Sequence, residues 1–143
     1  MIEVWRAFWG ELNMPESFYD KPYEGALNQA GHILIGAVLA VVVCLGWLVA
    51  FGEMPHKWAV GLALVGGYLT LIECLRQGWQ GADSVVDTAF VAQGVSLPLV
   101  TLSETQSGAL EVHAVEGLVG IGAAVLSLAL YVYPRARRKW QAR

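Results

Sequence analysis

Two pairs of polar residues flank a short linker between apolar stretches, and the members of each pair are one helical turn apart. Glu73 and Gln77 close the stretch before the linker, and Asp83 and Asp87 open the stretch after it. Residues four apart share one face of an α-helix, so each pair presents its polar groups together. His32 begins an earlier apolar stretch and adds an imidazole. Carboxylates and an imidazole beside apolar segments can bind a cation, bind a polar ligand or transfer protons.

Three interpretations of this cluster stay open. The first is a hydrogen-bonded network that locks helices together, with Asp83 or Ser84 capping one of them. The second is a site for Mg²⁺ or Ca²⁺, or for a lipid headgroup held through such a cation, because both ions prefer oxygen ligands. The third is proton transfer by a carboxylate. The sequence has no nucleophile motif or phosphate-binding glycine loop, so we predict no catalytic residues and no cofactor beyond that cation.

The apolar stretches that hold these residues are long enough to cross a membrane. The sequence is 56% hydrophobic, more than the surface of a small soluble domain can cover. Ile33 to Phe51 is nineteen residues without a charge, and Gly117 to Tyr133 is seventeen. About 20 apolar residues in a helix cross the ~30 Å hydrocarbon layer of a bilayer. We therefore predict an all-α transmembrane bundle.

The number of spans follows from the distribution of positive charge. Spans are predicted at about 31–51, 58–75, 84–102 and 114–133, and the third is marginal in hydropathy. With four crossings, Lys57 is the one cationic residue of nine that lies on the far side. The positive-inside rule favours this arrangement, with both termini cytoplasmic in a bacterial inner membrane. The eight cationic residues on the near side are Arg6, Lys21, Arg76, Arg135, Arg137, Arg138, Lys139 and Arg143.

Both flanks of the bundle are predicted to contact the membrane surface. Residues 1–30 form an interfacial segment that begins with an amphipathic helix, and residues 13–30 form a loop. The apolar stripe of that helix includes Trp5, Phe8 and Trp9, which favour the headgroup region, although it can also pack on the protein's own helices. Pro134 is expected to stop the last helix, so that residues 134–143 form a basic tail. Its anchoring residues on anionic lipid are Arg135, Arg137, Arg138 and Lys139.

Small residues four apart predict where helix backbones approach one another. Gly36 and Ala40 have this spacing, and so do Gly120 and Ala124. The pair Gly66 and Gly67 is expected to do the same for the second span.

The polar residues also resemble a known family. A His near the start of one helix, an acidic residue and Gln at a helix end, and a stretch of the form Asp-x-x-x-Asn-x-x-Gly are found in the VanZ-like family of small membrane proteins. His32, the segment Glu73 to Gln77 and the segment Asp87 to Gly94 are similar to that pattern. Val91 stands at the Asn position, and Gly81 to Asp83 lacks the Arg usual before the Asp.

This resemblance covers roughly residues 28–100 and implies a helical envelope protein linked to glycopeptide tolerance or envelope modification, with no agreed enzymatic activity. We therefore expect an inner-membrane protein whose acidic cluster binds an envelope ligand or supports a contact with a partner. Two alternatives are a phage holin-like lysis protein and an accessory subunit of a larger membrane complex. The expected partners are the lipid bilayer and either a second copy or such a complex. The sequence shows no basic groove with interleaved aromatic residues, so we do not expect nucleic acid as a partner.

The predicted topology can be tested by thiol labelling in intact cells. With Cys44 and Cys74 replaced by serine, a cysteine introduced at Gln106 should react with a membrane-impermeant reagent added outside. A cysteine introduced at Ala142 should react only after the cells are opened. The same accessibility at both positions would show that residues 114–133 do not cross the membrane and would contradict the four-span topology.

Overall fold

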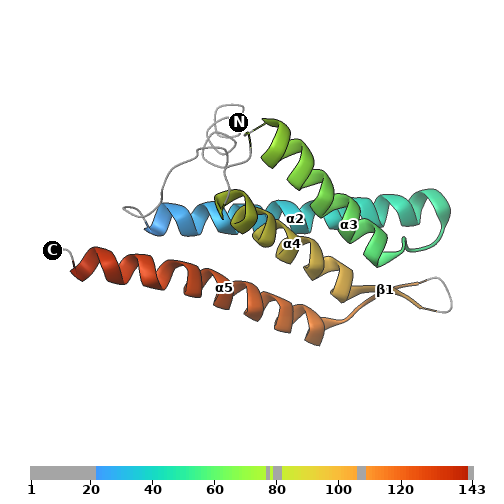
Figure 1. The fold of residues 1–143 in the computed structure, drawn as a ribbon. Coiled ribbons are helices and arrows are strands. Elements are labelled where there is room, and N and C mark those ends of the chain that lie inside the picture. Colours follow the sequence, from blue (N-terminus) through green and yellow to red (C-terminus); the bar gives the residue numbers. More distant parts are fainter. Residues whose placement is uncertain (1–21, 77, 79–81, 106–108, 142–143) are drawn as a thin grey trace, which may run out of the picture.

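The computed structural model describes residues 22–76, 78, 82–105 and 109–141, and helices make up most of this part of the chain (Figure 1). The first helix, α2, spans Pro22–Phe51, and α3 spans Lys57–Tyr68. A π-helical segment, η1, continues α3 over Leu69–Arg76. Helix α4 spans Ala82–Thr101, and α5 spans Ala114–Gln141. The predicted all-α class is confirmed at this level.

Four helical stretches are long and apolar enough to cross a membrane. They are Glu24–Phe51, Lys57–Arg76, Ser84–Thr101 and Ala114–Tyr133. Large apolar side chains along them face outwards: Val49 is 87% exposed, Trp58 78% and Leu62 75%. Apolar surface of this extent is not stable against water, whereas lipid covers it without penalty. These stretches agree with the spans that the sequence predicts and indicate a membrane protein.

Successive helices run in opposite directions. Figure 1 shows the start of α2 and the end of α5 at one end of the bundle. The turn between α2 and α3 lies at the opposite end, together with a β-hairpin of β1, Leu102–Glu104, and β2, Leu110–Val112. The hairpin is antiparallel and pairs Ser103 with Glu111. The predicted spans leave only a loop between residues 102 and 114, because three-residue strands carry too short a pattern to detect.

Helix α4 is the centre of the bundle and contacts α2, α3 and α5. Its closest neighbour is α2, and two glycines permit that approach. A Cβ atom on Gly36 would collide with the Val91 carbonyl oxygen and would lie 2.9 Å from the Val95 nitrogen. A Cβ atom on Gly94 would collide with the backbone of Ile33. The predicted close approach at Gly36 is confirmed, and α4 is the partner.

Small apolar groups fill the space on both sides of this crossing. Ala40 packs with Val91 and Val95 in one buried cluster. Ile33 and Phe90 pack with Ala124 of α5 in a second one. The expectation for the second span finds no support, because no atom of the described residues lies within 4 Å of a Cβ atom built on Gly66 or Gly67.

Two predicted helix boundaries are wrong. Residues 22–30 belong to α2 rather than to a loop. Proline is well tolerated in the first turn of a helix, and the negative charge of Glu24 in that turn interacts favourably with the helix dipole. Pro22 can therefore begin the helix. Helix α5 continues through Pro134 to Gln141. One proline removes a single backbone hydrogen bond, and the Arg and Lys residues that follow it are good helix formers.

The close contact of α2 and α4 predicts that replacing glycine by alanine affects thermal stability differently at Gly94 and at Gly122. Gly94→Ala should lower the thermal unfolding temperature in mild detergent, because the new methyl group forces α2 and α4 apart at a cost of ~1–3 kcal/mol. Gly122→Ala should leave it unchanged or raise it slightly, since Gly122 has open space around it and alanine favours a helix. Equal unfolding temperatures for the two variants would show that the crossing is not tight.

Candidate functional site

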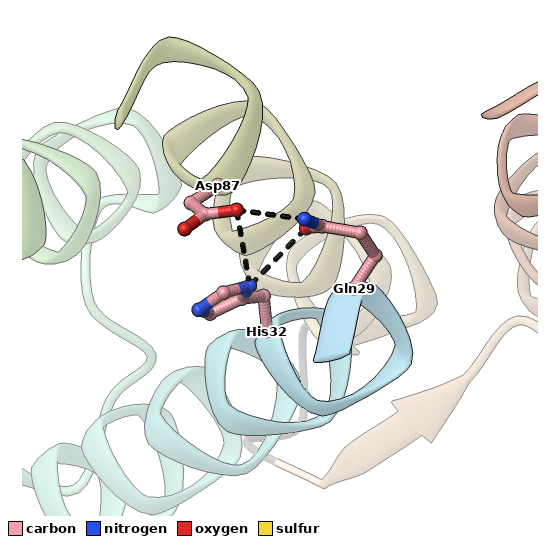
Figure 2. Close-up of polar contacts among 3 residues, drawn as sticks. All are labelled: Gln29, His32 and Asp87. Carbon is pink, nitrogen blue, oxygen red and sulfur yellow. Dashed lines mark hydrogen bonds and ion pairs between the residues drawn. The ribbon is translucent and has the colours of Figure 1, made fainter. Parts of the chain in front are cut away.

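Three polar side chains, two of them fully buried, meet where α2 crosses α4 (Figure 2). Gln29 Nε2 donates a hydrogen bond of 2.7 Å to Asp87 Oδ1. His32 Nδ1 lies 3.2 Å from Gln29 Oε1 and 3.6 Å from Asp87 Oδ1. Gln29 and His32 are each only 2% exposed. The three side chains therefore form a closed triangle that ties the first and third candidate spans together.

The hydrogen bonds of this triangle fix where the proton of His32 lies. Both oxygen atoms near Nδ1 can only accept, because one belongs to an amide carbonyl and the other to a carboxylate. Nδ1 therefore carries a proton and donates it toward them. Figure 2 shows the second ring nitrogen, Nε2, directed away from Gln29 and Asp87. It is available to a group outside the triangle.

Glu73 is the most deeply buried ionisable side chain among the described residues, with 0% exposure. It lies in the π-helical segment η1. Both of its carboxylate oxygens lack a hydrogen-bond partner among the described residues. A buried carboxylate without a hydrogen-bond partner is strongly unfavourable, so Glu73 requires a hydrogen-bond donor.

Tyr68 connects Glu73 with the triangle. Its ring meets the His32 ring edge to face, with centroids 5.9 Å apart. Its hydroxyl is within electrostatic reach of Glu73 and Asp87, although the geometry completes no hydrogen bond with a described residue. We refer to Gln29, His32, Tyr68, Glu73 and Asp87 as the buried polar cluster.

Further buried oxygens lie on the same helices. Ser84 is 1% exposed and precedes Asp87 by one turn. Asn28 Oδ1 and Thr88 Oγ1 are buried and have no hydrogen-bond partner in the described chain. Most buried polar atoms in proteins are paired, so Asn28 Oδ1 and Thr88 Oγ1 are further atoms that would accept a hydrogen bond.

Of the predicted site residues, the structure brings His32 and Asp87 into one cluster with Glu73. The side chain of Asp83 is not described, and Gln77 lies outside the described residues. Within the described part of the chain, no three His, Cys, Asp or Glu side chains are grouped closely enough to hold a metal ion. The structure therefore adds no support to the expected Mg²⁺ or Ca²⁺ site.

The predicted membrane anchors lie mostly outside the part of the chain whose side chains are described. Trp5, Phe8 and Trp9 are outside the described residues. Arg137 is exposed on α5. For Arg135, Arg138 and Lys139, only the helical backbone is described.

A groove between α2 and α3–η1 reaches the buried polar cluster. Its volume is about 370 Å³, within the ~300–1,000 Å³ typical of small-molecule sites. His32 and Tyr68 line it, Arg76 stands at one end, and the remaining lining is mostly aliphatic, including Leu39 and Leu71. We call it the α2–α3 groove.

Sequence reasoning missed two members of the cluster. Gln29 precedes His32 by three residues and therefore shares its helix face, but the predicted loop over 13–30 concealed this relation. Tyr68 and Glu73 are five apart, a separation that α-helical periodicity does not align. The π-helical segment changes which residues share a face, and π-helical turns often occur at functional sites.

Comparison with protein-family models, with curated proteins and with solved structures found no match to this chain.

The two buried acids should respond oppositely to substitution. Asp87→Ala should lower stability by about 2 kcal/mol, because it removes the hydrogen-bond acceptor of Gln29 Nε2 and the carboxylate that faces His32. Glu73→Met should not lower stability, since it replaces an unpartnered carboxylate by an apolar group of similar size. Thermal unfolding in mild detergent measures both effects, with Glu53→Ala at an exposed turn position as the control. A large loss for Glu73→Met would identify Glu73 as a structural residue.

Proposed function

We propose that this chain is a multi-pass protein of the bacterial inner membrane, with both termini in the cytoplasm. Its buried polar cluster binds the polar group of an envelope ligand from the cytoplasmic half of the bilayer. The observation that carries this proposal is Glu73, which is fully buried and has no hydrogen-bond partner in the described chain. A residue with these properties reduces stability unless another molecule satisfies it.

The contrast with Asp87 supports a ligand rather than a purely structural network. Asp87 accepts a hydrogen bond from Gln29 and faces His32, as expected of a residue that locks two helices. Glu73 has no such partners, and the neighbouring Tyr68 hydroxyl has none either among the described residues. Groups that reduce stability are typical of sites that are kept for function.

The α2–α3 groove limits the chemistry of the ligand. Aliphatic side chains line most of it, which suits an apolar chain. His32 and Tyr68 offer polar contacts partway along it, and Arg76 offers a positive charge at its end. These contacts match an amphiphile that has an apolar chain, hydrogen-bond donors and an adjacent anionic group. The donors satisfy the buried polar cluster, and the anion pairs with Arg76.

Our proposal includes the resemblance of the sequence to the VanZ-like family. His32, Glu73 and Asp87, which carry much of that resemblance, are all members of the buried polar cluster. Their burial in lipid-embedded helices favours a role in the envelope over a role in the cytoplasm.

A contact with a partner protein is the second candidate. Helix α5 exposes large apolar side chains along its length, including Val115, Leu118, Val125 and Leu130, and Gly122 leaves an open position among them. Open glycines on membrane helices allow a neighbouring helix to approach closely. An accessory subunit would co-purify with its complex in fixed stoichiometry after mild detergent extraction. A holin-like protein would instead collapse the membrane potential abruptly when induced.

Lipid-dependent stabilisation tests the ligand proposal. Bacterial polar lipid extract added to the purified protein should raise the thermal unfolding temperature by roughly 5 °C, because a ligand of the folded state stabilises it by mass action. Glu73→Gln and Arg76→Gln should each lose at least half of that increase. The exposed Glu53→Gln variant should keep it, because Glu53 lies in the turn at the other end of the bundle.

Equal stabilisation of wild type, Glu73→Gln and Arg76→Gln would contradict a ligand at the buried polar cluster. The absence of stabilisation in all proteins would contradict binding of a lipid-extract component. The unfolding temperatures without added lipid show whether each variant is folded.

A further inference from the structure

A second groove lies on the opposite side of α3, between α3 and α4. Its volume is about 600 Å³. Gly61 and Val65 line it from α3, and Val95 and Leu99 line it from α4. Lys57, the first residue of α3, is also part of the lining. We call it the α3–α4 groove. It shares no lining residue with the α2–α3 groove.

Lys57 is the unusual member of this lining. It is half-buried and forms no salt bridge with any residue that the structure describes. Its ammonium group is within electrostatic reach of the buried Cys44 thiol on α2, which is not an anionic partner. A half-buried ammonium group at the edge of a membrane span attracts anionic groups, because the apolar surroundings screen its charge less than water does. The Lys57 end of the groove is therefore complementary to negative charge.

The shape of the groove fits one hydrocarbon chain. Its lining extends from Lys57 to Val65 on α3 and from Ala92 to Val100 on α4. At 1.5 Å per residue, each stretch covers about 12 Å, which approaches the ~15 Å depth of one leaflet. Gly61 has no side chain and so leaves the groove open at this point, where a Cβ atom would lie 3.4 Å from the Leu99 side chain. Trp58 at the same end is typical of the membrane interface.

We propose that the α3–α4 groove binds an anionic membrane lipid, with its phosphate on Lys57 and one acyl chain between α3 and α4. The site lies at the end of the bundle opposite the start of α2, so it belongs to the other leaflet from the buried polar cluster. The proposal does not depend on a ligand at that cluster. It rests on the charge of Lys57 and on the apolar groove beside it.

Native mass spectrometry of the purified protein in mild detergent tests this site. Phosphatidylglycerol should bind at least 10-fold more tightly than phosphatidylcholine with the same acyl chains. Lys57→Gln should weaken phosphatidylglycerol binding about 10-fold, and Lys57→Arg should restore it. Gly61→Leu should weaken the binding of both lipids, because the larger side chain occupies the groove.

Two controls separate this site from other binding. Arg137→Gln removes an exposed positive charge elsewhere and should leave the phosphatidylglycerol affinity unchanged. Glu73→Gln should also leave it unchanged, so failure of the envelope-ligand proposal does not affect this result. Wild-type affinity in Lys57→Gln, or equal affinity of the wild type for the two lipids, would overturn the proposal. Thermal unfolding confirms that each variant is folded before binding is compared.

Discussion

The close crossing of α2 and α4 is the constraint on which the rest of the structure depends. Gly36 and Gly94 allow the two backbones to touch, and no side chain larger than hydrogen fits at either position. This contact brings the first turns of α4 against the early part of α2. As a result, Asp87 reaches both Gln29 and His32. The polar triangle is therefore a product of backbone proximity between two apolar helices.

Two carboxylates in the same cluster illustrate different physical situations. Asp87 is satisfied within the chain, and its hydrogen bonds orient the imidazole of His32. Glu73 is more deeply buried, and nothing in the described chain satisfies it. In a membrane interior, a hydrogen-bonded carboxylate such as Asp87 stabilises the contact between two helices, whereas a carboxylate without a partner, such as Glu73, destabilises the fold. The two acids of one cluster therefore differ in whether the described chain supplies their hydrogen-bond partners.

Much of the helical organisation was predictable because a long uncharged stretch is compatible with few structures besides a membrane-spanning helix. The hairpin of α2 and α3 follows from the same pattern, because the connection between the two long apolar stretches is too short for any other arrangement. The start of α2 was misplaced because Pro22 and Gly25 usually indicate a loop. Contacts across helices were not predictable: Gly36 and Gly66 look alike in sequence, and only Gly36 has a neighbouring backbone. The π-helical turn that places Glu73 next to Tyr68 left no signal in the hydrophobic pattern.

The β-hairpin ties α4 to α5, because the His113 backbone nitrogen donates to the Thr101 carbonyl oxygen at 2.7 Å and Ser103 contacts the His113 ring. Helix α3 lines both grooves. A sideways shift of α3 that widens one groove narrows the other. If both proposed ligands bind, the position of α3 couples their affinities, and this linkage acts equally in both directions.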